Sequence, residues 1–461
     1  MGESETVSGS QEDAVLMRRL DSLVLRLLAH RFKTAEGFWR IELDLLKLQR
    51  DTQAAITRAK GDHSTEGRHE LLQFQGTLWH AKRFGDALAW LLFKQERRRL
   101  YPLSENSRVP VLQEGHGARG LIAAASALSE RLGFPLLHDI TDLLRVGDIT
   151  FFRKDEPPST VEVKTTIVDS KTKGRLTTIN YSVTAVWPAD DQPPKVVQRP
   201  PGRPKQAAMT TKRFQRQLER MTRARAMGVA QVGKTTVIGG QPTLILEARS
   251  TDSSEHWPLL RRLVRRARQT GYACGVADGA TLYAVLYSAT GPTTELEGMK
   301  QLPSDLLASG FLFSEPDRNS ILVSTLPDPR GDGPHRYLPY YLYPLPRTAI
   351  VEMLHGRLVI ISILNEGKVA AALQEAGFHV GELTGGPNLK VSCELQTKRG
   401  RYRAELPGIN DSIREMIMEA RPLAYVVSIA TSLAEGIARE LPVIIEGLED
   451  ERRRGSRGVG R

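Results

Sequence analysis

Apolar side chains in the first hundred residues recur with the period of an amphipathic helix. Leucines follow one another at three- and four-residue intervals from Leu16 to Leu27, and the same spacing returns between Leu71 and Leu92. Residues three and four apart share one face of a helix, so these stripes predict helices that each bury one face. The polar run 61–64, Gly-Asp-His-Ser, predicts the turn between two of them. We expect this helical region to pack on the rest of the chain, on a second copy or on a partner protein.

After Pro110, short apolar runs alternate with helical ones, which is the pattern of an α/β region. The stretch 118–132 predicts a helix, 136–152 a strand-like segment broken at Gly147, and 160–167 a further strand. The prolines between 193 and 204 predict an extended loop. The later expectations are, in chain order, a basic helix over 212–227, a strand over 243–247, a helix over 257–270 and a strand over 281–287.

A separate α/β unit is expected from about residue 290 onward. Its apolar run Leu358–Leu364 predicts a buried strand, followed by a helix over 367–377 and a strand over 378–383. The segments 389–396 and 402–406 resemble the two strands of a hairpin. Ser412 and Glu415 have the spacing of a capping box, which predicts the start of a helix that runs to Ala420.

These patterns predict a multidomain α/β protein. At a typical size of ~150 residues per domain, the length of the chain is enough for several parts that each bury a core. The expected order is a disordered tail (1–12), a helical domain (13–112), a central α/β domain (113–290), a C-terminal α/β domain (291–447) and a basic, disordered tail (448–461).

Composition narrows the class of protein without deciding its function. Two cysteines, Cys274 and Cys393, are too few for a disulfide scaffold or a four-thiolate zinc site, and they favour a reducing compartment. The N-terminus is polar, and no apolar run approaches the roughly 20 residues that a membrane-spanning helix needs. We therefore expect a cytoplasmic protein that is neither secreted nor embedded in a membrane.

Positive charge is concentrated in one segment of the chain. Lys and Arg number 64 against 53 Asp and Glu, which gives a formal net charge of +11. The 31 residues from Lys195 to Arg225 hold ten basic residues and one acid, a charge of +9. Smaller arginine clusters follow at 261–268 and 452–461. A concentrated patch neutralises phosphates and releases their condensed counterions, which favours a nucleic-acid partner over a merely solvated linker.

Two acids and a lysine stand among apolar strand residues in the centre of the chain. Asp148 opens one predicted strand, and Glu162 and Lys164 lie on the next. Residues i and i+2 of a strand point to the same face, so Glu162 and Lys164 project together, and a hairpin brings the Asp148 carboxylate alongside. Two converging carboxylates form a hard-oxygen site for Mg²⁺, with the Val163 carbonyl as a further ligand. Such a cation polarises a phosphate and lowers the pKa of a bound water, while Lys164 assists that water or stabilises charge on phosphorus.

This arrangement resembles the PD-(D/E)xK superfamily of restriction-endonuclease-like nucleases, whose signature is an Asp that opens one strand and a Glu-x-Lys on the next. The resemblance covers residues 113–290 and implies an α/β/α core around a mixed sheet. Gly147 takes the place of the proline before the Asp. The same resemblance implies an acid on the first helix, for which Glu130 is a candidate, and a glutamine on the basic helix, Gln217 or Gln215. Of these, Gln217 is expected to be catalytic.

The resulting expectation is a Mg²⁺-dependent endonuclease that hydrolyses DNA phosphodiester bonds, with Mn²⁺ as a substitute cation. Asp148, Glu162 and Val163 hold the metal, and Lys164 and Gln217 assist the chemistry. Analogy with the superfamily suggests defence against foreign DNA. The residues expected to bind the nucleic-acid backbone are Arg199, Arg203, Lys205, Lys212, Arg213, Arg216 and Arg220.

Two other functions fit the same sequence. One is a catalytically inactive nuclease fold that binds nucleic acid, although the intact motif argues against it. The other is a protein-interaction module in which the helical and C-terminal regions act. RNA in place of DNA, and single strands in place of duplexes, remain alternative substrates.

Two further motifs lie in or beside the basic segment. The stretch 228–235 satisfies the phosphate-loop pattern, but that loop needs a strand before it and a helix after it, and the opposite order is predicted here. The stretch 199–205 is close to an AT-hook, but only its Gly-Arg-Pro part survives, which favours a stiff basic loop that touches DNA phosphates. His138 and Asp139 are interpreted as a structural pair rather than as site residues.

Overall fold

The chain divides into two units, which are described separately below. Unit 1 comprises residues 1–229 and 329–342, and unit 2 comprises residues 230–328 and 343–461. The division falls at 229/230 and not at the 290/291 boundary expected from the sequence. The structure, a computed structural model, describes residues 9–29, 34–104, 111–112, 114–173, 176–186, 212–232, 234–238, 241–244, 255–292, 302, 304, 309–314, 320–327, 337–381, 389–397, 400–406 and 408–457.

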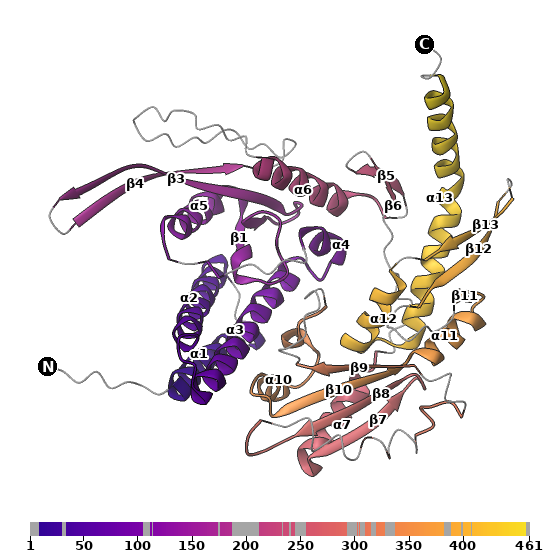
Figure 1. Cartoon of the computed structure of the whole chain (residues 1–461), viewed down its shortest axis with the longest axis horizontal. Coiled ribbons are helices and arrows are strands. Elements are labelled where there is room, and N and C mark those ends of the chain that lie inside the picture. The colour runs from indigo at the N-terminus through magenta and orange to yellow at the C-terminus, as the bar shows by residue number, and fades with distance from the viewer. Residues whose placement is uncertain are drawn as a thin grey trace. The chain divides into compact units, whose positions relative to one another are not determined.

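Three long helices form the N-terminal part of unit 1: α1 (Gly9–Leu28), α2 (Ala35–Ala59) and α3 (Thr65–Leu92). They pack side by side (Figure 1), and the predicted stripes, such as Leu20 and Phe74, are buried between them. In the predicted turn, the Ser64 hydroxyl caps α3 by accepting a hydrogen bond of 2.9 Å from the Gly67 N–H. Helix α1 begins at Gly9, so residues 9–12 of the expected tail are helical. A short helix α4 (Arg97–Leu100) and a 3₁₀ turn η1 (Tyr101–Leu103) follow α3.

A four-stranded sheet and its flanking helices follow these helices in the sequence. The elements of this part are α5 (His116–Leu132), β1 (Phe134–Leu137), the 3₁₀ turn η2 (His138–Ile140), β2 (Ile149–Phe152), β3 (Ser159–Lys173), β4 (Leu176–Val186) and α6 (Lys212–Val229). The strand order is β1-β2-β3-β4 and every pairing is antiparallel, so the expected mixed sheet is wrong for the described strands. The reason is that each strand connects to the next by a short segment, whereas a parallel pair needs a crossover of a dozen or more residues. The β3–β4 hairpin extends well beyond β1 and β2 (Figure 1).

Helices pack on both faces of this sheet at β3. Helix α5 covers the face that bears Thr165, and it approaches so closely that a Cβ added to Gly120 would lie 2.0 Å from the Thr165 hydroxyl. Helix α6 lies on the opposite face, where its Met221 lies beside Gly147 and Thr160. Because side chains alternate along a strand, Glu162 and Lys164 share the face of Thr160. The acidic strand residues therefore face the side of the basic helix.

Unit 2 is built on a second four-stranded antiparallel sheet with the order β7-β8-β10-β9. Helix α7 packs on β7 and β8. Strands β8 and β10 pair directly, Thr281 opposite Leu364, which explains why the chain does not divide near residue 290. The bounds of these elements are α7 Trp257–Thr270, β7 Tyr272–Ala277, β8 Thr281–Tyr287, β9 Ile321–Leu326, α10 Arg347–Leu354 and β10 Leu358–Asn365.

A smaller three-stranded sheet and the helices α11, α12 and α13 complete the description of unit 2, beside a hairpin of β5 (Thr235–Ile238) and β6 (Gln241–Leu244). The expected hairpin over 389–406 is confirmed as β12 and β13, and Leu373, Met416 and Val426 belong to the core that joins these elements. The bounds are α11 Glu366–Glu375, β11 His379–Val380, β12 Val391–Thr397, β13 Gly400–Glu405, α12 Ile409–Met418 and α13 Leu423–Arg457. Across the described residues, no helix has the length and apolar character needed to cross a membrane.

Two local expectations in this part are wrong. Helix α12 begins at Ile409, after Gly408 with its positive φ of 89°, so Ser412 lies inside the helix rather than at its cap. Its hydroxyl donates back to the Gly408 carbonyl, and Glu415 accepts a hydrogen bond of 2.5 Å from the Tyr425 hydroxyl instead of closing a capping box. Helix α13 continues to Arg457 through most of the tail that was expected to be disordered.

Candidate functional site

The β2–β3 hairpin brings Asp148 and Glu162 close together. Its register ends with Ile149 paired with Val161, so Asp148 directly precedes the paired residues of β2 and Glu162 directly follows those of β3. The Asp148 N–H donates to the Val161 carbonyl at 2.8 Å, and the Asp148 Oδ2 atom accepts from the Val163 N–H at 2.6 Å. The negative charge of Glu162 acts on Asp148, so the two carboxylates lie near each other. That they share one cation stays a prediction.

Gly147, where the superfamily motif has proline, is required by this hairpin. Its φ is +79°, a left-handed conformation that proline cannot adopt and that other residues rarely do. A Cβ at this position would also lie 2.4 Å from the Thr160 Cγ2 atom and 3.2 Å from the Val161 carbonyl oxygen. The departure from the motif thus follows from how closely the chain passes β3 before Asp148.

Lys164 pairs with Glu162 on the same face of β3. The Lys164 Nζ atom forms an ion pair with Glu162 Oε1. The Glu162 side chain is 10% exposed and the Lys164 side chain 48%, so the carboxylate is buried while the ammonium group reaches solvent. The expectation that these side chains project together is confirmed. For Val163, the structure shows its N–H donating to Asp148, and the expected role of its carbonyl as a metal ligand stays a prediction.

The environment of Asp148 disfavours its ionised form. Burial, and secondarily the negative charge of Glu162, raise the pKa of Asp148 to about 7, while the Val163 N–H and Lys164 oppose that shift. Within the described part of the chain, no group of three or more His, Cys, Asp and Glu side chains is placed to hold a metal ion. The donors available to a cation are therefore this pair of hard carboxylate groups, whose mutual repulsion a divalent ion would relieve. That chemistry fits Mg²⁺ and Mn²⁺.

His138 supports the site from behind. A carbonyl can only accept, so its Nδ1–H donates to the Gly147 carbonyl at 3.1 Å, and its Nε2 accepts from the Thr150 hydroxyl at 2.7 Å. Burial lowers the pKa of His138 to about 3, so the ring is neutral. The structural interpretation of His138 agrees with these contacts. Asp139 has a pKa raised by burial, and it lies close enough to Lys82 and Glu162 for their charges to act on it.

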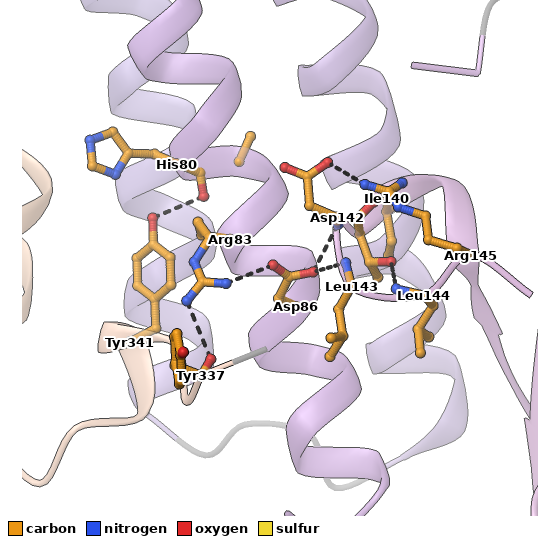
Figure 2. Close-up of polar contacts among 12 residues, drawn as sticks. His80, Arg83, Asp86, Ile140, Asp142, Leu143, Leu144, Arg145, Tyr337 and Tyr341 are labelled. Carbon is orange, nitrogen blue, oxygen red and sulfur yellow. Dashed lines mark hydrogen bonds and ion pairs between the residues drawn. The ribbon is translucent and has the colours of Figure 1, made fainter. Parts of the chain in front are cut away.

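The loop that leads into Asp148 is anchored on helix α3 by Asp86 (Figure 2). The buried Asp86 Oδ1 atom accepts hydrogen bonds of 2.8 Å from the backbone N–H groups of both Asp142 and Leu143. Its Oδ2 atom pairs with Arg83 at 3.0 Å, and Arg83 also donates to the Tyr337 carbonyl. Sequence reasoning missed Asp86. The available signal was a charged pair inside an otherwise apolar helical stretch, which is costly unless both charges are partnered.

Gly85 makes this anchoring possible. A Cβ at Gly85 would lie 2.0 Å from the Ile140 carbonyl oxygen, so only a glycine lets α3 approach the loop this closely. The Arg145 side chain closes the loop on itself, because its guanidinium donates to the Asp142 carboxylate at 3.1 Å (Figure 2). The loop before Asp148 is therefore fixed by Asp86 at residues 142 and 143 and by the contact of Arg145 with Asp142.

Helix α6 presents two different faces. The face toward the sheet carries Gln217, Met221 and Ala224 at helical spacing, and Met221 packs beside Gly147. This places Gln217 one turn from Met221 on the inward face, whereas Gln215 is exposed. The outward face carries an exposed arginine stripe, Arg216, Arg220 and Arg223.

The remaining basic candidates divide between described and undescribed residues. Lys212 and Arg213 form the first turn of α6, but their side chains lie outside the description, as do Arg199, Arg203 and Lys205 and the AT-hook-like stretch altogether. The phosphate-loop-like stretch follows helix α6 and leads into strand β5, which is the opposite of the order that such a loop needs. Glu130 is exposed near the C-terminal end of α5, more than two helical turns past Gly120, which packs against β3, and its candidate role stays a prediction.

A hollow opens beside the acidic pair, between α6, the α4–η1 segment and the turn before β3. It encloses about 460 Å³ including its mouth, and Thr160 and Met221 form the wall nearest to Asp148. Its lining combines apolar side chains with two guanidinium groups: Phe93, Arg99, Leu103, Pro157, Pro158, Thr160, Met221, Ala224, Arg225, Gly228 and Val229.

Comparison with protein-family models, with curated proteins and with solved structures finds no match to this chain. The site is therefore interpreted from its own geometry. It consists of two neighbouring carboxylates and an adjacent lysine, and helix α6 beside it carries exposed arginines on its outer face.

Proposed function

We propose that this chain is a Mg²⁺-dependent nuclease of the PD-(D/E)xK type that hydrolyses phosphodiester bonds in DNA. The observation that carries the proposal is the proximity of Asp148 and Glu162 across the β2–β3 hairpin, with Lys164 on the same face. A strand pair that served only stability would gain nothing from burying two like charges beside each other. A site for a divalent cation needs that arrangement.

Asp148 and Glu162 would hold the cation. When bound, Mg²⁺ supplies charge that polarises the phosphate and lowers the pKa of a bound water. The Val163 N–H fixes the Asp148 Oδ2 atom and thereby the orientation of this carboxylate. The ion pair with Lys164 holds the Glu162 carboxylate in place beside Asp148.

Lys164 would act on the phosphate or on the attacking water. Its ammonium group is exposed to solvent beside the buried Glu162 carboxylate, so it is accessible to an approaching phosphate. In that position it stabilises negative charge as it develops on phosphorus, or orients the water and accepts its proton once deprotonated. Gln217 faces the same side of the sheet and would orient substrate oxygens through its amide.

Helix α6 would position the nucleic-acid backbone over this centre. The stripe of Arg216, Arg220 and Arg223 repeats along one exposed face, which suits successive phosphates. The hollow with Arg99 and Arg225 lies against this helix, and its apolar walls would suit a sugar or base beside the reacting phosphate. A reducing, cytoplasmic setting is part of the proposal, supported by the two free cysteines, and defence against foreign DNA enters by analogy alone.

The test is cleavage of plasmid, single-stranded DNA and RNA by the full-length protein with Mg²⁺ or Mn²⁺. The Glu162→Gln variant removes one carboxylate from the site, and we expect a loss of about 10²-fold or more in cleavage rate with binding retained. Glu156→Gln is the matched control, because this glutamate lies in the turn of the same hairpin, exposed and paired only with Arg153 among the described residues. A wild type that binds DNA but cuts no substrate with either cation would replace this proposal by that of an inactive, nucleic-acid-binding fold.

A further inference from the structure

Helix α7 of unit 2 carries a second cluster of positive charge, separate from the site in unit 1. Its apolar side chains pack on the sheet and are buried: Trp257, Leu260, Leu263, Val264 and Ala267. Its opposite face carries four exposed arginines, Arg261, Arg262, Arg265 and Arg266. We call these four residues the α7 arginine face. The sequence of α7 contains no Asp or Glu that could neutralise them.

Arg268, the fifth arginine of this helix, has a structural role, because its guanidinium group binds other residues of unit 2. The Arg268 guanidinium binds Glu352 through two nitrogens, at 2.9 and 2.7 Å, and donates to the Thr348 hydroxyl at 2.7 Å. By contrast, the α7 arginine face makes no hydrogen bond or ion pair with any residue that the structure describes. Packing within unit 2 therefore accounts for Arg268, whereas the described residues show no polar contact that explains the other four.

The spacing of the four arginines works against helix stability. Arg261 and Arg265, and likewise Arg262 and Arg266, are four residues apart, so the Cβ atoms of each pair lie about 6 Å apart and their like charges are neighbours on the helix surface. Like charges at this spacing destabilise a helix by a few tenths of a kcal/mol per pair at most, unless an external anion bridges them. Two parallel rows of guanidinium groups form a surface for an extended anion with regularly repeated charges.

The sugar–phosphate backbone of a nucleic acid has that chemistry. Guanidinium groups bind phosphate oxygens bidentately, and a rigid helix holds them in a fixed array. An anionic membrane fits less well, because a helix that binds lipid also inserts an apolar face, and the apolar face of α7 is buried in the core. We infer that the α7 arginine face is a second, sequence-independent binding surface for the nucleic-acid backbone. This inference concerns binding alone, so it holds whether or not the centre at Asp148 cuts.

The experiment compares two full-length variants that lose the same charge. One carries Arg261→Gln, Arg262→Gln, Arg265→Gln and Arg266→Gln, all exposed positions where glutamine keeps a good helix former. The control carries four exposed and scattered changes, Lys60→Gln, Lys390→Gln, Arg401→Gln and Arg439→Gln. Affinity for labelled duplex DNA, single-stranded DNA and RNA is measured with EDTA present, between about 50 and 200 mM salt, so that no cleavage occurs and the counterion slope is obtained.

Each lost phosphate contact lowers the slope of log K against log salt by about 0.9 for a duplex. We expect the α7 variant to lose a slope of about 2 to 4 and at least about tenfold in affinity, while the scattered control stays close to wild type. The DNA and RNA arms show which backbone is preferred. Equal slopes and affinities for both variants would overturn the inference, and so would an α7 variant that binds nucleic acid normally but loses capture by phosphatidylserine vesicles. A wild type that binds in this salt-dependent way but never cuts would refute the proposed nuclease and leave the α7 surface standing.

Discussion

Asp148 is held in place by the backbone of the residue that follows Glu162. Its Oδ2 atom accepts a hydrogen bond of 2.6 Å from the Val163 N–H, and its own N–H donates to the Val161 carbonyl. The two bonds flank Glu162 on both sides in the sequence. The distance between the two acids is therefore set by strand pairing and not by flexible side chains, which is what a site with fixed ligand geometry requires.

Replacing Lys164 by Gln should slow cleavage without weakening DNA binding. The ammonium group forms an ion pair with Glu162, so under the proposed function its loss would remove charge stabilisation at the reacting phosphate, worth about 10²-fold or more in rate. Lys154→Gln, an exposed lysine in the turn of the same hairpin, should cleave like wild type. Single-turnover rates and equilibrium affinities for both variants check this, and a Lys164→Gln protein that loses affinity but keeps its rate would assign the lysine to binding instead.

A methyl group at Gly85 should damage the protein far more than one at Gly76 of the same helix. The added Cβ at Gly85 would meet the Ile140 backbone at 2.0 Å, whereas nothing lies within 4 Å of the one at Gly76. Gly76→Ala should be neutral or more stable by up to about 1 kcal/mol, because alanine is the better helix former. Gly85→Ala should lose both stability and cleavage activity. Thermal unfolding of the two variants decides the point, and equal melting temperatures would mean that α3 does not pack on the loop as described.

Breaking the Asp86 anchor should cost about 3–5 kcal/mol of unfolding free energy. Asp86→Ala removes the carboxylate that pairs with the buried Arg83 and the acceptor of two backbone N–H groups. Asp44→Ala serves as the control, since it breaks an exposed ion pair with Arg26 that should be worth less than about 1 kcal/mol. Chemical denaturation measures both. Similar losses for the two variants would contradict the role assigned to Asp86.

His138 should make the protein less stable as the pH falls from 6.5 toward 3. The pKa of this buried histidine is about 3 in the folded protein against 6.5 for the unfolded chain, so in this range the unfolded state takes up a proton that the folded state refuses. The contribution is fully present above pH 6.5 and is lost on acidification, with a slope of at most about 1.4 kcal/mol per pH unit. His138→Gln should flatten the stability profile between pH 6.5 and 4. An unchanged slope in this variant would show that another group carries the acid sensitivity.

Local patterns predicted most of the helices and the acidic hairpin, because both depend on residues close together in the sequence. The spacing that places Leu16 and Leu20 on one helix face, and Glu162 and Lys164 on one strand face, is a property of the chain itself. Gln217 also lies on the inward face of α6. Its expected catalytic role stays a prediction.

Long-range pairing could not be predicted in the same way. Strand β8 pairs with β10, more than 70 residues later, and that contact moves the division of the chain to 229/230. Asp86 was missed for the same reason, since its partners on the loop lie over 50 residues away. At Ser412 and Glu415 a local pattern was misleading. The spacing of a capping box is present, but the helix begins earlier, directly after Gly408, and Glu415 accepts a hydrogen bond from the Tyr425 hydroxyl instead.

The central claim, that Asp148 and Glu162 share one divalent cation, is tested most directly by calorimetric titration of the nucleic-acid-free protein with Mn²⁺ and Mg²⁺. The account predicts a single site in the wild type, weakened at least about tenfold by Asp148→Asn and by Glu162→Gln, because each removes one of two charged oxygen ligands. Glu156→Gln should bind as the wild type does. Unchanged binding in both site variants, or no binding by the wild type with either cation, would contradict the claim.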